Sequence, residues 1–547
     1  MSQEQSNKPK IADPIKEGLA RGWKVFGTEL DGAFRAPPAQ LDCDVLIVGS
    51  GAGAGITAEL LTKAGLKIII VEEGPLRSSS DFRQLEAEAY GQLYQEAGGR
   101  KNTEQTMPIL QGRCVGGSTT VNWAGAFRTP ASTLEVWASK YGLSDMTPAA
   151  LGPWFEQVER RLNIGEWMGE PNANNDVLRR GALKIGAEPV KMHRNVKGCW
   201  NLGSCGLGCP TNAKQSMLVT TIPAALDLGA TLLVQTRAQR YELQGDRVAA
   251  LICQPIHLNG DANGAPLRIT AKHFVLAGGA INSPALLMRS GAPDPHKLLG
   301  KRTFLHPTLV SSAVMPEAVQ GWAGAPMSVF SDHFLHQHPV DGPVGFKLET
   351  APVHPAFAMT NLGGFGAELG PRVKAYPHTH VGIALLRDGF HAESPGGTVS
   401  LKSDGSAALA YTLSDYLLEG ARRAHLSMAE LQFAAGAKTV RPGHEQAADY
   451  GSWEAAKAAI ARLDYKPFLT VVGSAHVMGG CSLAAEASRG VVQPDGRHWQ
   501  LKNLSVHDGS LFPTSIGANP QVTVYTLAAR LATGLAQSLS GKAVQLA

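Results

Sequence analysis

A glycine-rich turn between a short apolar run and a helical pattern most constrains how this chain can fold. Residues 45–48 are apolar and are followed directly by Gly49-Ser50-Gly51-Ala52-Gly53-Ala54. In this G-x-G-x-x-G/A pattern, glycines permit a tight turn and let a pyrophosphate approach the backbone at a helix N-terminus. A second apolar run, residues 68–71, ends in Glu72, at the spacing expected for an acid that bonds the adenosine ribose. The segment predicts a Rossmann-like βαβ unit, and the pattern alone does not choose between FAD and NAD.

Length, charge and hydrophobicity exclude several classes of protein. With 547 residues, the chain is long enough for about three domain-sized units. Its formal net charge of +4 argues against a nucleic-acid binder, which usually carries a basic stripe. No long uninterrupted apolar run occurs, and the N-terminus lacks the apolar core of a signal peptide. We therefore expect no transmembrane helix and a cytoplasmic location, with peripheral membrane contact as an open alternative. Seven scattered cysteines fit reduced thiols better than a disulfide framework.

Changes of pattern along the chain divide it into four parts. They are an N-terminal appendage at 1–40, a nucleotide-binding domain at 41–304 with a helical and loop insertion at about 140–225, a second domain at 305–470, and a return to the first domain at 471–547. The appendage has large apolar residues at helical spacing, namely Ile15, Leu19, Trp23 and Phe26. We interpret it as a helix docked on the main domain, with a membrane-surface or partner-binding helix as the alternative.

Three further segments carry motifs of one enzyme family. The first reads Gly112-Arg113-Cys114-Val115-Gly116-Gly117-Ser118-Thr119-Thr120-Val121-Asn122, and the second runs from Gly279 to Gly291. The third is divided among 476–481, 506–513 and 519–523. In this order they resemble the signatures of the glucose–methanol–choline (GMC) oxidoreductases, with Gly480 in place of the usual Thr. The resemblance covers about residues 42–547.

The resemblance implies FAD as the cofactor and a characteristic fold. That fold is α/β, with a Rossmann-like FAD-binding domain and a second α+β substrate domain built on an antiparallel sheet. The cofactor-binding residues that it implies are Gly49, Gly51, Ala52, Gly53, Glu72, Gly112, Arg113, Gly116, Gly117, Ser118, Asn122, Ala277, Asp508, Gly509, Pro520 and Gln521. The implied partners are a small-molecule alcohol and an electron acceptor, which is oxygen, a quinone or a cytochrome.

Oxidising an alcohol requires a group that takes the hydroxyl proton while hydride leaves for the flavin. Histidine suits this role because its pKa lies near neutrality. The resemblance assigns the base to His476 and its partner, which bonds the substrate oxygen, to Asn519. Other histidines, including His306, are interpreted as surface or packing residues. No His lies near Asn122, where relatives with covalent flavin attach it, so non-covalent FAD is expected.

A cysteine cluster leaves alternatives open. Thiolates at the spacing of Cys199, Cys205 and Cys209 can hold an iron–sulfur cluster, although a glycine-rich loop with free thiols is the simpler interpretation. Residues 205–216 look more like the loop of family members that act on long-chain or bulky apolar alcohols. The sequence therefore predicts FAD-dependent oxidation of an apolar alcohol. The alternatives are a sugar or polyol dehydrogenase with an iron–sulfur relay to a cytochrome, a non-redox member such as a hydroxynitrile lyase, and a non-catalytic flavin-binding protein.

Overall fold

The larger sheet of the protein combines segments from all along the chain. The computed structural model describes residues 11–27, 29–30, 33–38, 40–361 and 363–546. The strand order is β1-β10-β5-β4-β13-β12-β11, with β24 also paired to β13. Pairing is parallel from β1 to β13 and β24, whereas β12 and β11 add an antiparallel hairpin. The strands are β1 (Lys24–Phe26), β4 (Gln40–Val48), β5 (Ile68–Val71), β10 (Thr231–Leu233), β11 (Thr236–Gln244), β12 (Arg247–Pro255), β13 (Leu267–Leu276) and β24 (Leu504–Val506).

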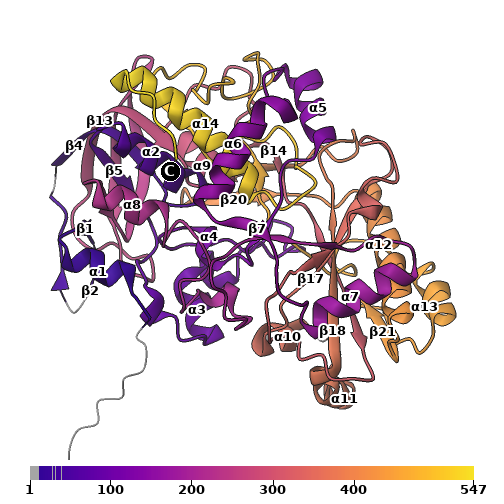
Figure 1. The fold of residues 1–547 in the computed structure, drawn as a ribbon. Helices are drawn as coiled ribbons and strands as arrows, with labels where there is room; N and C mark the ends of the chain where they lie inside the picture. The colour runs from indigo at the N-terminus through magenta and orange to yellow at the C-terminus, as the bar shows by residue number, and fades with distance from the viewer. Residues whose placement is uncertain (1–10, 28, 31–32, 39, 362, 547) are drawn as a thin grey trace, which may run out of the picture.

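Helices from both ends of the chain cover this sheet. Figure 1 shows α2, in indigo, beside the yellow α14, although more than 450 residues separate them, and the two helices pack against each other. Residues 53–62 of α2 are all buried, as expected for a helix enclosed between a sheet and other helices. The helices of this unit are α1 (Pro14–Ala20), α2 (Ala52–Lys63), α5 (Ala131–Tyr141), α6 (Pro148–Arg161), α8 (Thr221–Asp227), α9 (Asn282–Arg289) and α14 (Gln521–Ser540).

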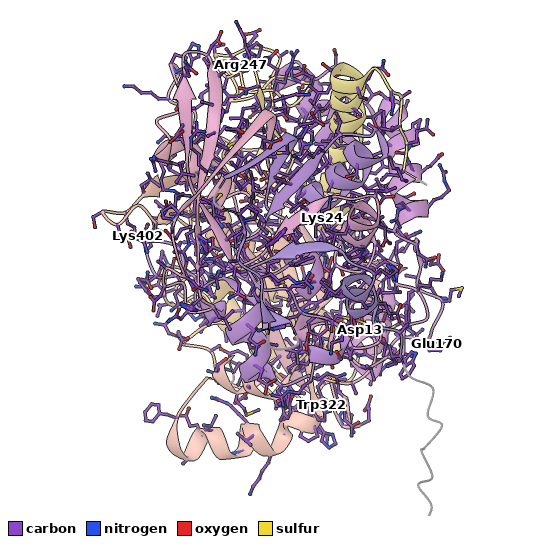
Figure 2. The ribbon with its side chains drawn as sticks, turned by 90° about the vertical axis from the view of Figure 1, so that its left-hand side faces the viewer. Asp13, Lys24, Glu170, Arg247, Trp322 and Lys402 are labelled. Carbon is purple, nitrogen blue, oxygen red and sulfur yellow. The ribbon has the colours of Figure 1, made fainter. Side chains whose placement is uncertain are left out.

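A second unit is built on an antiparallel sheet of order β17-β18-β15-β21, with β22 paired to β15. Its strands are β15 (Thr308–Val314), β17 (Phe346–Thr350), β18 (Thr379–Leu386), β21 (Thr439–Pro442) and β22 (Val472–Gly473). Its helices are α7 (Ala173–Lys184), α10 (Pro355–Asn361), α11 (Leu369–Ala375), α12 (Asp415–Ala434) and α13 (Trp453–Ile460). Figure 2 shows this unit, marked by Trp322, at the opposite end of the molecule from Arg247, where β12 begins.

Short elements join the two units. A small antiparallel sheet has the order β20-β19-β14-β23, and its β19–β20 hairpin turns at Asp404-Gly405. Its strands are β14 (Lys301–Phe304), β19 (Gly397–Leu401), β20 (Ala407–Ala410) and β23 (Met478–Gly479). The remaining elements are β2 (Glu29–Leu30), β3 (Ala33–Phe34), β6 (Gly125–Ala126), β7 (Ile164–Glu166), β8 (Val190–Lys191), β9 (His193–Asn195), β16 (Val329–Phe330), α3 (Glu86–Leu93) and α4 (Ser118–Val121).

The structure confirms the predicted fold class and differs from the sequence interpretation at the N-terminus. The predicted helix is present as α1, which buries Ile15, but it ends at Ala20. Gly22 follows with φ +98°, a left-handed conformation that stops the helix. The assignment of Trp23 and Phe26 to that helix was therefore wrong: Phe26 lies in β1, which is paired to β10 of the main sheet.

Two elements cross the predicted domain limits. α7, from the predicted insertion, packs on α12 of the second unit, and β22, from the predicted C-terminal part, pairs with β15. At the α7 contact, a Cβ on Gly181 would lie 2.3 Å from the Leu431 carbonyl oxygen, so the close approach depends on glycine. Within the part of the chain that the structure describes, no helix is both long and apolar enough to cross a membrane.

Candidate active site

A large cavity lies where the carboxyl ends of β4, β5, β13 and β24 meet the second unit. Its volume is about 1660 Å³, above the ~300–1,000 Å³ of an ordinary ligand pocket, which leaves room for a dinucleotide and a substrate. The structure brings nearly all the predicted residues to its wall. They are Gly49, Gly51, Ala52, Gly53, Glu72, Gly112, Arg113, Gly117, Ser118, Asn122, Ala277, Asp508, Gly509, Pro520 and Gln521, together with His476 and Asn519. Gly116 lies behind the wall, where its N–H donates to Ser50 Oγ at 3.0 Å.

The glycine turn forms a cradle that side chains would fill. Gly49 has φ +99°, and a Cβ there would lie 2.3 Å from the Ala277 carbonyl oxygen. A Cβ on Gly117 would lie 2.8 Å from the Cα of Gly51, so the two loops approach each other backbone to backbone. Gly51 is the N-cap of α2, whose first turn has no side-chain cap and no acidic residue. Free N–H groups at a helix N-terminus favour anions, so this cradle fits the phosphates of a dinucleotide.

Glu72 fixes the glycine turn through hydrogen bonds to its backbone and to Ser50. Its Oε2 accepts hydrogen bonds from the Ser50 N–H at 3.1 Å and the Ser50 hydroxyl at 2.6 Å, and its Oε1 accepts from the Gly74 N–H at 2.7 Å. Burial raises the pKa of this carboxyl above its usual value. Glu72 lines the cavity, and its expected bond to the adenosine ribose stays a prediction.

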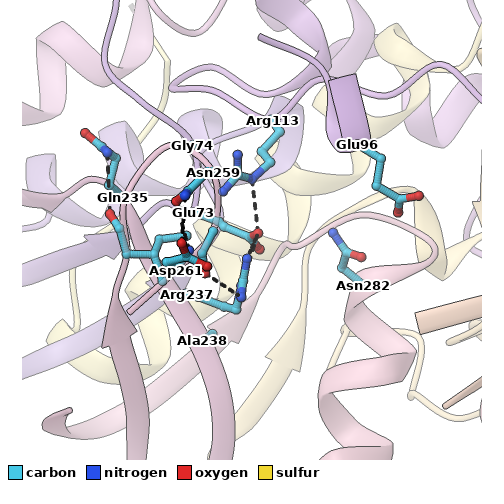
Figure 3. A network of polar contacts seen from close by, with 12 residues as sticks. Glu73, Gly74, Glu96, Arg113, Gln235, Arg237, Ala238, Asn259, Asp261 and Asn282 are labelled. Carbon is cyan, nitrogen blue, oxygen red and sulfur yellow. Dashed lines mark hydrogen bonds and ion pairs between the residues drawn. The ribbon is translucent and has the colours of Figure 1, made fainter. Parts of the chain in front are cut away.

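The neighbouring acid, Glu73, was missed by the sequence analysis. Figure 3 shows Arg113 and Arg237 converging on it. Its Oε1 lies 3.1 Å from Arg113 Nε and 3.2 Å from Arg237 Nη2, and all three residues line the cavity. Two consecutive acidic residues, Glu72 and Glu73, follow the strand at 68–71, and this pair is the sequence signal that could have identified Glu73. Two cations sharing one carboxylate leave net positive charge beside the nucleotide cradle, which also suits an anionic ligand.

Asp508 joins the second and third motifs. Its Oδ2 accepts from the Gly279 N–H at 2.8 Å and the Ser283 hydroxyl at 2.5 Å, and its Oδ1 accepts from the N–H and hydroxyl of Ser510. These bonds hold β24 and the Gly279 loop together at the floor of the cavity. The expected contact of Asp508 and Gly509 with the cofactor ribityl and phosphate part stays a prediction.

The start of α14 is tied to the Gly112–Asn122 segment. Asn122 Nδ2 donates to Gln521 Oε1 at 2.7 Å, and Gln521 Nε2 donates to the Gly125 carbonyl at 2.5 Å. Pro520 is the N-cap of the helix, where its missing N–H costs no hydrogen bond within the helix. Two predicted cofactor residues that are 399 positions apart therefore form one polar contact at the cavity wall.

His476 and Asn519, the predicted catalytic pair, both face the cavity. Burial, reinforced by the positive charge of Lys347, lowers the pKa of His476 to about 3. The ring is partly exposed to the cavity, and the role of His476 as the base stays a prediction. Asn519 Nδ2 donates to Glu349 Oε2 at 3.3 Å, while Asn519 Oδ1 has no partner among the described residues.

Three buried residues behind this pair were not predicted. His306 Nδ1 lies 3.0 Å from His476 Nδ1, so the ring interpreted as surface or packing contacts the predicted base directly. Glu349 Oε1 lies 3.5 Å from Lys347 Nζ, and both side chains are almost fully buried on β17. Lys347 Nζ also lies over the rings of Phe127 and Phe330. The charged residues Lys347 and Glu349, two positions apart on one face of the strand Phe-Lys-Leu-Glu-Thr, are the signal that could have found this pair.

The cysteine cluster does not form a metal site in this structure. Among the described residues, no group of three or more His, Cys, Asp or Glu side chains could hold a metal ion. The thiols of Cys199, Cys205 and Cys209 are free and partly buried. Cys205 Sγ contacts Arg194 Nη2 at 3.7 Å, and Cys209 Sγ accepts from the Lys214 N–H at 3.5 Å.

Comparison with known proteins agrees with this geometry. Two family models described as GMC oxidoreductase match residues 90–308 and 392–528, together more than half of the chain. The long-chain-alcohol oxidase FAO3 of Arabidopsis thaliana is 26% identical over 528 residues, covering 92% of this chain and 69% of that protein. The uncharacterized GMC-type oxidoreductase y4nJ of Sinorhizobium fredii is 29% identical over 504 residues, covering 90% of this chain and 94% of that protein.

Solved structures show the same fold at lower identity. A variant of formate oxidase from Aspergillus oryzae superposes with a TM-score of 0.67 at 15% identity, covering 92% of this chain and 99% of that one. The ordered motifs, the glycine cradle and the two family matches agree over nearly the whole length. The chain therefore belongs to the GMC oxidoreductase family and is an FAD-binding oxidoreductase acting on the CH–OH group of its donors.

Proposed function

We propose that this protein oxidises an apolar alcohol, such as a long-chain aliphatic alcohol, to the aldehyde or ketone with non-covalently bound FAD. The observation that carries the proposal is the apolar wall of the cavity in the second unit. Val310 on β15 and Val381, Ile383 and Leu385 on β18 line it, and they pack in one hydrophobic cluster with Met327. A wall of this kind favours an alkyl chain over a sugar, because burying polyol hydroxyls without partners is costly.

The chain's own residues divide into a cofactor part and a substrate part. The Gly49–Ala54 turn, Arg113 and the start of α14 would hold the FAD, with the phosphates at the α2 N-terminus. When bound, the flavin supplies the acceptor for the hydride that leaves the carbinol carbon. The apolar wall would exclude water from the reacting atoms and orient the alkyl chain.

His476 and Asn519 would handle the hydroxyl group. His476 takes the hydroxyl proton on the ring nitrogen that faces the cavity, Nε2, because its Nδ1 is occupied by His306. The Asn519 Nδ2 group donates one hydrogen to Glu349 and would donate its second hydrogen to the substrate oxygen. The substrate hydroxyl would then donate to His476 and accept from Asn519, which fixes its direction.

Molecular oxygen is the acceptor that we propose for reoxidation. Its support is that FAO3, a relative of this chain, is an alcohol oxidase by name. The test compares the rate of peroxide release during turnover with the rate at which an artificial quinone is consumed. Peroxide release at the rate of alcohol oxidation identifies oxygen, whereas faster turnover with the quinone points to a quinone or cytochrome acceptor.

A series of alcohols of increasing chain length tests the substrate. We expect kcat/KM to rise by about fourfold for each added methylene until the cavity is filled, since a buried CH₂ contributes ~0.8 kcal/mol. Glucose should give little turnover. Reduction of the flavin by glucose but by no alkanol would overturn the proposal in favour of a sugar dehydrogenase. A flavin that no alcohol reduces without oxygen would point to a lyase.

The attachment of the flavin has its own test. Residues 115–124 contain no His, Cys or Tyr to form a covalent link, which supports non-covalent binding. After acid precipitation of the purified enzyme, all of the flavin absorbance should therefore appear in the supernatant. Flavin that stays with the precipitate and with a tryptic peptide would show a covalent bond, and its peptide would identify the attachment residue.

A further inference from the structure

His306 is held against His476 in a way that simple packing does not require. The two rings stack with centroids 5.2 Å apart and planes 29° apart, and their Nδ1 atoms lie 3.0 Å from each other. His306 is fully buried, and its Nε2 has no partner among the described residues. Each Nδ1 is therefore the only partner that the described residues provide for the other.

A hydrogen bond between two Nδ1 atoms requires that one carries a proton and the other accepts it. In the first arrangement His476 Nδ1–H donates, which leaves His476 Nε2 as a bare lone pair towards the cavity. In the second, His306 Nδ1–H donates, and His476 must carry its proton on Nε2, where it cannot act as a base. Among the described residues His306 Nε2 has no partner in either arrangement, so its hydrogen bonding does not distinguish the two.

Proton uptake from the substrate is compatible only with the first arrangement, in which His476 Nδ1–H donates to His306. A protonated His476 carries hydrogen on both ring nitrogens, and only a His306 with a bare Nδ1 can then accept from it. A hydrogen bond to a charged group is stronger than one between neutral groups, so this contact tightens as the imidazolium forms. Among the described residues, no carboxylate is hydrogen-bonded to either ring. Of the charged or titratable groups around the pair, the positive charge of Lys347 disfavours a proton on the rings, Glu349 pairs with Lys347, and Asp388 accepts from the Tyr411 hydroxyl.

The turn that carries His306 is fixed by a buried carboxylate. Asp388 accepts hydrogen bonds from the Leu305 N–H at 3.0 Å and the His306 N–H at 3.2 Å, and from the Tyr411 hydroxyl at 2.7 Å. His306 has φ +49°, a left-handed conformation that is uncommon for a residue other than glycine. Such strain persists where the surroundings over-determine it, and it gathers at functional sites.

We propose that His306 is a positioning residue that accepts the Nδ1 hydrogen of His476, so that Nε2 of His476 is free to take the alcohol proton. In the reaction the substrate O–H bond breaks and its proton goes to His476 Nε2. The hydride leaves the carbinol carbon with two electrons, which reduce the flavin. The Nδ1 hydrogen stays between the two rings and spreads the positive charge towards His306. This inference rests on the proposed function and assigns a further residue to it.

Two substitutions that suit a left-handed residue separate positioning from packing. His306→Gly keeps the backbone conformation and deletes the acceptor, whereas His306→Asn also tolerates that conformation and places a carbonyl oxygen close to the position of Nδ1. In the flavin-loaded enzyme, we expect His306→Gly to lower kcat by ~10–100-fold, the range for losing a hydrogen bond to a charged group, with KM little changed. His306→Asn should recover most of that loss.

Isotope effects give a readout that a packing role would not move. The solvent deuterium isotope effect on kcat should rise in His306→Gly, because proton removal becomes slower, and should return towards the wild-type value in His306→Asn. Equal losses in both variants with an unchanged isotope effect would overturn the proposal, as would wild-type kcat in His306→Gly. If His306→Gly does not fold, His306→Asn still decides: a large loss with a normal flavin spectrum counts against the proposal, and near wild-type turnover supports it. If the wild type turns over no alcohol at all, the proposed function fails, and this inference fails with it.

Discussion

Replacing His476 with Ala should lower kcat by about 10²–10⁴-fold, the usual contribution of a positioned general base. The physical reason is that, of the residues the structure describes, His476 alone has a titratable ring that faces the cavity beside Asn519 and a nitrogen free to accept there. Among the residues that the structure describes, nothing else at this point is placed to accept the hydroxyl proton. The measurement is steady-state turnover of a long-chain alcohol, with rates divided by the flavin content of each preparation.

Flavin content and a distant histidine provide the controls for that experiment. The variant should bind FAD normally, because His476 takes no part in the glycine cradle. His338→Gln changes an exposed histidine and should leave kcat unchanged. A His476→Ala enzyme with full flavin and wild-type kcat would show that another group takes the proton, and the assignment of the base would have to be withdrawn.

The holoenzyme should lose stability steeply as the pH falls from about 6.5 towards 4. Six histidines have their pKa lowered to about 3 or 4 by burial: His273, His380, His425, His476, His498 and His507. In the unfolded chain each would titrate near its ordinary value of ~6.5. Below that pH the unfolded state binds protons that the folded state excludes, so stability is complete above the unfolded pKa and is lost on acidification. Each histidine can add up to ~1.4 kcal/mol per pH unit to the slope of the unfolding free energy.

Thermal unfolding at fixed scan rate between pH 5 and 7 measures this effect. His498 offers a matched variant, because its Nδ1 accepts from the N–H groups of Gln500 and Leu501, and the carbonyl oxygen of Asn can replace that acceptor without titrating. His498→Asn should therefore flatten the pH dependence, whereas His338→Gln, at an exposed position, should not. An unfolding midpoint that is the same at pH 5 and pH 7 would contradict the prediction.

Local patterns predicted the nucleotide half of the site well. The strand at 68–71 and the glycine turn at 49–54 that leads into α2 both appear where the sequence placed them. Each depends on neighbours within a few positions: an apolar run, or glycine at a required φ. The helical spacing of the N-terminal segment wrongly predicted Trp23 to be helical, because Gly22 ends the helix before the apolar pattern ends.

The substrate half depended on contacts that no local pattern contains. His306 reads as an ordinary histidine before a proline, and only Asp388, 82 positions later, fixes the turn that aims it at His476. Glu349 and Lys347 are recognisable as a pair only once β17 is known to be buried, and the partner of Glu349 is 170 positions away in Asn519. The low pKa of His476 has the same origin, because the burial and the lysine that cause it belong to another unit of the chain.

The pairing of both chain ends in one sheet has a consequence for how the protein is made. A ribosome delivers β4 and α2 some 450 residues before β24 and α14, which complete the layer around them. Until then, the face of α2 that packs on α14 and the edge of β13 that pairs with β24 are exposed. Exposed apolar surfaces and unpaired strand edges of this kind bind chaperones and promote aggregation. Contacts between segments so far apart are slow to form, so the cofactor domain can close only after β24 and α14 have been made. The protein can therefore take up its flavin only after these last elements have been synthesised.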